Sequence, residues 1–204
     1  MKYLFIGAHP DDIEYSCGGT VTRLVSEGHE VNLMIMTGGG ASTSGSVNER
    51  ICEQHLAYDA SGCKGLFILD YEDGAIRADA QTIREVSRNI GALNPDIVVT
   101  HYPYDSHQDH REVAAIVRSA TRRKYSLLYF DSYSSEGFKP NLYVDVSAHI
   151  DRKARMLRAF ASQIEKYEKR GVNFIEKSLL INKLNGYECN AGYAEAFAVE
   201  SCMI

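Results

Sequence analysis

The chain has 204 residues, of which 45% are hydrophobic and 24% charged, and its net charge is −5. This size and composition fit one sizeable domain that spans residues 1–204 and has its own core. The acidic balance and the lack of a dense Lys/Arg block argue against nucleic-acid binding, and the apolar stretches are far shorter than the ~20 residues of a membrane-spanning helix. Five scattered cysteines argue against a disulfide framework and favour reduced thiols in the cytoplasm.

Strand-like and helix-like segments alternate along the first two thirds of the chain. Patterns of buried strands occur at residues 2–7, 30–36, 65–69, 97–100 and 126–130. Helical patterns lie between them, at residues 18–27, about 47–61, 79–93 and about 109–122, and Ser46 and Glu49 have the spacing of a capping box. This alternation predicts an α/β fold with a mostly parallel, Rossmann-like sheet and helices on both faces.

The last third of the chain is less regular. It contains a short strand pattern at 142–144, one long helical pattern over 147–168, a helix near 174–184 and a final strand near 194–200. We therefore expect a short C-terminal α+β extension. The glycine-rich segment Gly38–Gly45 predicts a flexible loop, which can be either a lid over substrate or a plain connection.

Two polar segments follow strands that are expected to be parallel. His9-Pro10-Asp11-Asp12 comes after the first strand, and the segment His101–His110 comes after the fourth. Together they hold four of the seven histidines in the chain. Neither segment is a dinucleotide fingerprint or a phosphate-binding P-loop. Because open α/β sheets bind ligands beyond the carboxyl ends of their strands, we expect both segments to meet at one site.

The residue types in these segments are those of a catalytic metal site. Such a site binds zinc through three imidazole or carboxylate ligands and leaves one position for water, whose pKa falls toward neutrality. A carboxylate that is not a ligand can then accept the proton of that water, and the pair Asp11 and Asp12 suits this division of roles. His107 and His110 stand three apart at a helix start and can point to one site. The alternative is that these aspartates only cap helices and the histidines only pack.

The chain resembles a known family, the LmbE-like or PIG-L zinc N-deacetylases. The resemblance rests on His9-Pro10-Asp11-Asp12 with the later pair Gly18-Gly19, and on His107-Gln108-Asp109-His110. Weaker similarity covers most of the remaining chain, at Met36-Thr37, Arg50 with Glu53, Asp73-Gly74 and Tyr193–Phe197. The resemblance implies an enzyme that removes an acetyl group from the nitrogen of an amino sugar or a similar small molecule.

Carried over by position, the resemblance implies three zinc ligands, His9, Asp12 and His110. It implies that Asp11 is the general base that activates water and that His107 stabilises the tetrahedral oxyanion and protonates the leaving amine. Zinc is the expected metal, although iron can also occupy a site made of histidines and aspartate.

The resemblance also implies two supporting roles. Asp109 would orient a neighbouring imidazole, and Arg50 would bind substrate hydroxyls or an anionic substituent. The chain departs from the family pattern at Gln108, where proline is common, and at Asp105, where some members have a mobile tyrosine. Tyr102 and Tyr104 lie near enough in the sequence to cover part of that role.

Other functions remain open at this stage. A metal-dependent phosphoesterase would use similar ligands, but two-metal phosphatases need more carboxylates. The zinc deaminase signature is absent. A non-catalytic sugar-binding domain would not need Asp11 and His107 beside the ligands. We expect a small N-acylated amino sugar as substrate, no nucleic-acid or membrane partner, and a homo-oligomer.

Overall fold

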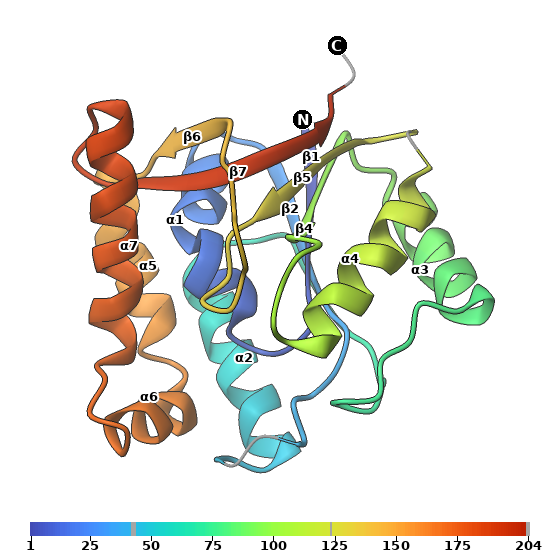
Figure 1. Ribbon diagram of the computed structural model, residues 1–204, viewed down its shortest axis with the longest axis horizontal. Helices are drawn as coiled ribbons and strands as arrows, with labels where there is room; N and C mark the ends of the chain where they lie inside the picture. The colour runs from blue at the N-terminus through green and yellow to red at the C-terminus, as the bar shows by residue number, and fades with distance from the viewer. Residues whose placement is uncertain (42–43, 123, 203–204) are drawn as a thin grey trace.

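The computed structural model describes residues 1–41, 44–122 and 124–202, which form a seven-stranded sheet between helical layers (Figure 1). The strand order is β3-β2-β1-β4-β5-β7-β6, where neighbours in the list are hydrogen-bonded. The strands are β1 (Lys2–Gly7), β2 (Glu30–Ile35), β3 (Gly65–Ile68), β4 (Ile97–His101), β5 (Ser126–Phe130), β6 (Leu142–Asp145) and β7 (Ala194–Ser201). The first five run parallel, and β7 pairs antiparallel with both β5 and β6. The predicted mostly parallel α/β sheet is confirmed.

The register of the central strands brings the two polar segments together. Phe5 of β1 lies opposite both Leu33 of β2 and Val99 of β4, and all three side chains are buried. Strands that are buried on both faces read as continuous apolar runs, which is why they were visible in the sequence. Because β1 ends at Gly7 and β4 ends at His101, the loops that follow them leave the same edge of the sheet.

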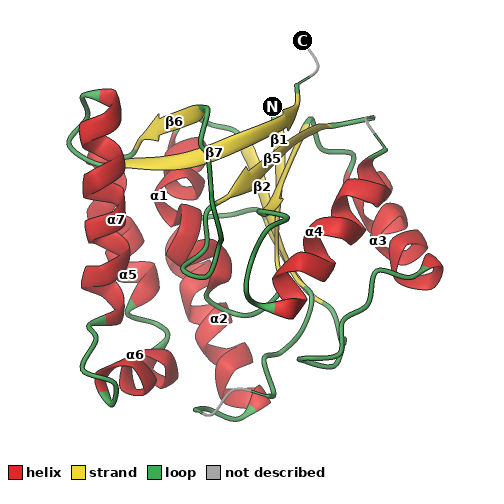
Figure 2. Ribbon diagram, viewed as in Figure 1, coloured by secondary structure: helices red, strands yellow, loops and turns green. Residues whose placement is uncertain are grey.

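Helices cover both faces of the sheet (Figure 2). On one side are α1 (Asp12–Ser26), α2 (Val47–Ser61), α5 (Ile150–Leu157), α6 (Ala161–Glu168) and α7 (Phe174–Cys189), and on the other are α3 (Ala80–Leu93) and α4 (Gln108–Thr121). Each side has its own hydrophobic core. Val86 and Val117 belong to the cluster under α3 and α4, whereas Ile13 and Phe160 belong to the cluster under the other helices. The helices on both faces, and the C-terminal extension of β6, β7 and α5–α7, confirm the predicted architecture.

The first helix begins earlier than predicted. The sequence predicted a helix over residues 18–27, but α1 starts at Asp12 and carries a kink at Cys17, whose φ of −142° is not helical. The carboxylate of Glu195 accepts hydrogen bonds from the backbone N–H groups of Gly19 and Thr20, at 2.9 and 2.6 Å. It thereby satisfies donors that the kink exposes, as an N-cap does at a helix start. The prediction found only the second half of this helix.

The long helix predicted over 147–168 is three separate elements. A 3-10 turn covers Ser147–His149, α5 follows, and α6 starts only at Ala161. Phe160, with φ −88° and ψ 62°, interrupts the helix and is itself fully buried in the core. Burial of this large side chain outweighs the local helical preference of the segment.

Other local predictions have clear outcomes. The capping box is confirmed, because the Ser46 hydroxyl accepts from the Glu49 N–H and the Glu49 carboxylate accepts from the Ser46 N–H. The lid prediction for Gly38–Gly45 includes residues 42 and 43, which lie outside the described residues. Among the helices of the described residues, none has the length and apolar character that crossing a membrane requires.

Candidate active site

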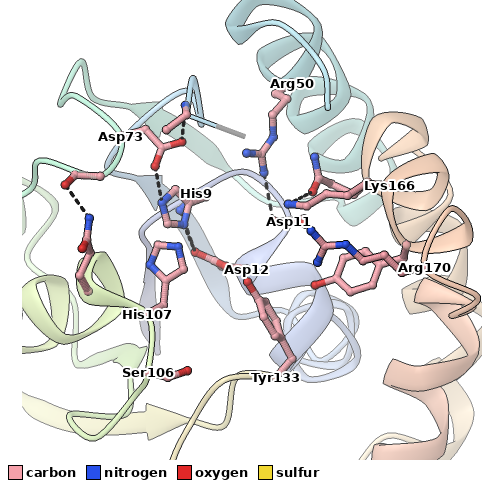
Figure 3. Close-up of a pocket in the computed structure, with 15 residues that line it drawn as sticks. His9, Asp11, Asp12, Arg50, Asp73, Ser106, His107, Tyr133, Lys166 and Arg170 are labelled. Atoms are coloured by element: carbon pink, nitrogen blue, oxygen red, sulfur yellow. Dashed lines mark hydrogen bonds and ion pairs between the residues drawn. The ribbon is translucent and has the colours of Figure 1, made fainter. Parts of the chain in front are cut away.

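A cavity of about 470 Å³ opens at the edge of the sheet where β1 and β4 end (Figure 3). His9, Asp11 and Asp12 line it from the loop after β1 and the start of α1. His107 lines it from the residue before α4, and Tyr133 from the loop after β5. The two polar segments singled out in the sequence therefore face one cavity.

His9 is oriented by carboxylates on both sides of its ring. Its Nε2 lies 3.0 Å from Asp73 Oδ1 and 3.2 Å from Asp109 Oδ2, and its Nδ1 lies 3.4 Å from Asp12 Oδ2. Burial lowers the pKa of His9, but its bonds to Asp109, Asp12 and Asp73 more than offset this and hold the pKa well above the ordinary value. With Nε2 donating to two carboxylates, Nδ1 faces Asp12, and loss of the Nδ1 proton would direct its lone pair there.

His110 is oriented in the complementary way. Its Nδ1 lies 3.0 Å from Asp105 Oδ2, and its Nε2 lies 3.4 Å from Asp12 Oδ1. Ser132 donates a short hydrogen bond to the same Asp105 oxygen. Because Nδ1 donates to a carboxylate, Nε2 carries the lone pair, and it is buried with no hydrogen-bond partner among the described residues.

The arrangement fits a divalent cation. One nitrogen each of His9 and His110 borders the Asp12 carboxylate, which is itself 6% exposed. The ion pairs of Asp12, Asp73 and Asp109 within the described residues are all with imidazoles. Among the described residues, these largely buried carboxylates pair with imidazoles and not with Lys or Arg, and one buried imidazole nitrogen has no hydrogen-bond partner. This is the environment that metal ligands provide.

The cluster contains more than one group of suitable ligand atoms. Three triads bring one ligand atom each within 4.8 Å among the described residues: His9, His107 and His110; Asp12, His101 and His110; and His9, Asp73 and Asp109. The predicted ligands are divided over these triads. His9 and His110 share the first, and Asp12 and His110 share the second.

His101 is poorly placed to compete as a ligand. It is fully buried, its ring stacks on His110 with centroids 4.0 Å apart, and its Nε2 accepts a hydrogen bond from the Ala8 N–H at 3.0 Å. Burial and the neighbouring His110 lower its pKa to about 4. A neutral imidazole whose free lone pair is already used supports the site by packing.

Asp11 lies beside His9 and Asp12 in a strained backbone conformation. Its φ is +92°, in the left-handed region that an aspartate rarely adopts. Gln54 accepts a hydrogen bond from its backbone N–H, and the Arg50 guanidinium lies 3.4 Å from its Oδ1. Burial raises the pKa of Asp11 to about 7, and the Arg50 charge opposes this rise. A carboxyl with a pKa near neutrality suits a general base.

His107 faces the cavity from the N-cap position of α4. Its Nδ1 accepts a hydrogen bond from the Asp109 backbone N–H at 3.3 Å, so the proton of the neutral ring lies on Nε2. The ring stacks on His110 at 4.5 Å and meets His9 edge-on at 4.8 Å between centroids. Burial and the neighbouring His110 and His9 lower its pKa. A half-buried N–H donor next to His9 and His110 can donate to an oxygen on which negative charge develops.

Asp109 and Arg50 both reach the site. Asp109 is fully buried, and its Oδ2 accepts from the Gly74 N–H at 2.7 Å as well as contacting His9. Arg50 lines the cavity but is only 4% exposed, and its guanidinium donates to the backbone carbonyls of Gly39 and Pro10 at 3.1 and 2.7 Å. Most of the donors of Arg50 are therefore used to hold the loop that carries Asp11.

Sequence reasoning gave no site role to two carboxylates that touch the imidazoles. Asp73 bridges His9 to the Ala41 backbone N–H, which lies 2.8 Å from its Oδ2. Asp105 holds His110. Asp73 appeared in the sequence only as part of a common Asp-Gly pair, and Asp105 only as a departure from a family pattern. The polar segment around Asp105 was the signal that could have identified it.

The chain matches the family model described as "PIG-L: GlcNAc-PI de-N-acetylase" over residues 4–121, which is more than half of its length. It is 28% identical to the diacetylchitobiose deacetylase of Thermococcus kodakarensis over 79% of this chain and 70% of the relative. It is 31% identical to the uncharacterized deacetylase YaiS of Escherichia coli over 70% of this chain and 80% of the relative. The conserved protein TT1542 of Thermus thermophilus has the same fold, with a TM-score of 0.89, 23% identity, and coverage of 99% and 95% of the two chains.

Together with the similarity to known deacetylases, the fold and the cluster of carboxylates and imidazoles identify an N-deacetylase, that is, an amidase that cleaves a linear C–N bond. The chain belongs to the PIG-L, or LmbE-like, family.

Proposed function

We propose that the chain is a zinc-dependent deacetylase that releases acetate from an N-acetylated amino sugar. The observation that carries the proposal is the convergence of His9 Nδ1 and His110 Nε2 on the Asp12 carboxylate, with Asp11 beside them. We assign His9, Asp12 and His110 as the ligands. When bound there, zinc lowers the pKa of a water molecule and polarises the amide carbonyl.

Each remaining residue then has one task for the amide hydrolysis. Asp11 accepts the proton of the attacking water, because its carboxylate lines the cavity beside the ligands and its pKa lies near neutrality. His107 donates from Nε2 to the oxygen that becomes negative, a contribution worth about 3 kcal/mol for a well-placed donor. The proton that Asp11 holds then goes to the departing amine.

Carboxylates behind the imidazoles keep the ligands in place. Asp109 and Asp73 fix the ring of His9, and Asp105 fixes that of His110. Arg50 pairs with Asp11 and also lines the cavity. Its guanidinium is therefore placed to contact a substrate that fills the cavity. A homo-oligomeric state and the choice between zinc and iron stay predictions.

The test is acetate release from N-acetylglucosamine and diacetylchitobiose. We expect activity in the purified protein, loss on treatment with a chelator and return on addition of zinc. Asp11→Asn should reduce turnover by roughly 10²–10⁴-fold with zinc still bound, because it removes only the base. The matched control is Asp59→Asn, an exposed aspartate on α2, which should leave activity unchanged.

Three results would contradict the proposal. Turnover of Asp11→Asn close to that of the wild type would remove Asp11 as the base. Absence of acetate release after stoichiometric zinc loading would argue for a binding domain. Hydrolysis of p-nitrophenyl phosphate in place of the amides would favour the phosphoesterase alternative.

A further inference from the structure

A second, much smaller cavity of about 10 Å³ lies between α1, α7 and the loop that follows β5. Its polar lining includes Ser16 of α1, Ser178 and Asn182 of α7, and Asp131 of the loop. Among the described residues, none lines both this cavity and the active-site cavity. Its volume is the room that one particle of the size of a water molecule takes. We call this cavity the α1–α7 chamber.

The chamber is lined by residues whose buried oxygen atoms lack a partner. Asn182 is 2% exposed, and its Oδ1 has no hydrogen-bond partner among the described residues. The Ser16 hydroxyl and the Tyr15 hydroxyl, on the facing helix, are also buried without a partner there. Nearly all buried polar atoms of folded proteins have a partner, so three unpartnered oxygens around one chamber indicate that something polar or charged occupies it.

The kink of α1 fixes the direction of a further hydroxyl in the lining. In a continuous helix the Gly19 N–H would donate to the Tyr15 carbonyl, but it donates to Glu195 instead. The Tyr15 carbonyl accepts from the Ser178 hydroxyl at 2.8 Å. Because the proton of Ser178 is used in this bond, its Oγ has only lone pairs to offer to the chamber.

Asp131 adds a negative charge to the lining. No Lys, Arg or His of the described residues lies within 4.0 Å of its carboxylate. Burial raises the pKa of Asp131 to about 6, and the charge of Asp105 raises it further, against a hydrogen bond from Ser135. A cation beside this carboxylate would stabilise its ionised form.

The set of oxygen atoms favours a cation over a water molecule. A water molecule has two protons to donate, whereas Asp131, Asn182 Oδ1 and Ser178 Oγ are three acceptors. Carboxylate, amide and hydroxyl oxygens can together replace the hydration shell of a hard cation. Asp131 is the only charged residue in the described lining, so an ion with a single positive charge balances it.

We propose that the α1–α7 chamber binds a monovalent cation, Na⁺ or K⁺, through the oxygen atoms of Asp131, Asn182 and Ser178, with the Ser16 hydroxyl beside them. This site is separate from the assigned zinc ligands and goes beyond the proposed deacetylase function.

The position of the chamber gives the cation a structural consequence for the active site. Asp131 precedes Ser132, whose hydroxyl donates to Asp105, the carboxylate that holds His110. A cation on Asp131 therefore connects α1 and α7 to the loop that supports His110.

The test is thermal unfolding of the zinc-loaded protein in NaCl, KCl or tetramethylammonium chloride at equal ionic strength. Tetramethylammonium is too large for a chamber that takes one water-sized particle, so it controls for screening. We expect Na⁺ or K⁺ to raise Tm in a saturable way, by roughly 3–6 °C at about ten times its Kd, because it binds only the folded chain. Comparison of the two salts identifies the ion.

Two variants assign the effect to the chamber. Asp131→Asn removes the charge, and Asn182→Leu replaces the amide by an apolar side chain of similar shape. Each should abolish the difference in Tm between the stabilising salt and tetramethylammonium chloride. The matched control is Asp59→Asn, an exposed aspartate on α2, which should keep the full difference.

The connection to His110 has its own readout. In a competitive metal titration, the stabilising cation should tighten zinc binding several-fold in the wild type and leave zinc binding unchanged in Asn182→Leu. Equal zinc affinity with and without the cation in the wild type would overturn this connection.

Two results would overturn the cation site itself. Equal Tm values of the wild type in all three salts would mean that the chamber holds only water. A cation-specific rise that persists in both variants would mean that the ion binds elsewhere. If Asp131→Asn did not fold, Asn182→Leu would decide alone. Acetate release enters none of these measurements, so the deacetylase proposal stands or fails separately.

Discussion

A buried ion pair connects three elements of the fold. The effect of its removal on the free energy of unfolding can be estimated. Lys153 of α5 lies 2.7 Å from Glu195 Oε1 of β7, and both side chains are fully buried. Glu195 also accepts the two backbone hydrogen bonds from the kink of α1, at Gly19 and Thr20. The perturbation is Lys153→Met, which keeps the length of the side chain and removes its charge.

The expected effect on stability is large. Without Lys153, the Glu195 carboxylate is buried with two backbone N–H partners and no cation, and breaking a buried pair in this way costs about 3–5 kcal/mol of the free energy of unfolding. For a chain of this size, that corresponds to a fall of roughly 6–20 °C in Tm. The double variant Lys153→Met with Glu195→Gln should recover part of the loss, because the buried charge is then gone.

The assay is urea unfolding followed by circular dichroism, with Lys64→Met as the control. Lys64 pairs with Glu30 at the same distance of 2.7 Å, but its side chain is 65% exposed. Screening by water should make this change nearly neutral. The reasoning is refuted if Lys153→Met costs no more stability than Lys64→Met, or if the double variant is less stable than Lys153→Met alone.

Four further predictions concern the site, one of its loops and helix α3. Asp105→Asn should lower zinc affinity by roughly 10–100-fold in a competitive metal titration, because it weakens the support of His110, and an unchanged affinity would contradict this role. Gly39→Ala should reduce turnover and thermal stability, since φ is +74° there and a Cβ would overlap the Arg50 guanidinium. Gly91→Ala, with open space around it on α3, should instead stabilise by about 0.5–1 kcal/mol in the same unfolding assay. Arg50→Lys should lower kcat by roughly tenfold with little change in KM, because lysine cannot bridge both carbonyls and Asp11; a change confined to KM would favour direct substrate binding.

The sheet was predictable because its signals are local. Four of the five parallel strands are short, largely buried runs and the edge strand β3 is partly exposed, but each is followed by a polar or glycine-containing turn. The true start of α1 was not predictable in this way, because the partner that satisfies its kink, Glu195, lies 176 residues from Gly19 in the chain. The break at Phe160 likewise depends on a core that forms only in the folded protein.

Some residues of the candidate site were likewise predictable from local sequence signals, and others were not. His9, Asp12, His107 and His110 could be brought together from the sequence, since parallel strands carry their loops to one edge of the sheet. The other residues that line the cavity come from segments whose position does not follow from the order of parallel strands. Lys166 reaches the cavity only because α6 starts after the break that the sequence did not show.

Helix α2 connects these two parts of the site. Arg50 and Glu53 are three residues apart and therefore lie on one face of the helix. Arg50 donates to the backbone carbonyl of Pro10 in the loop after β1, whereas Glu53 accepts hydrogen bonds from the backbone N–H and hydroxyl of Ser162, at 2.6 and 2.7 Å, near the start of α6. One turn of α2 thus holds both the loop that carries Asp11 and the start of α6, whose Lys166 lines the same cavity.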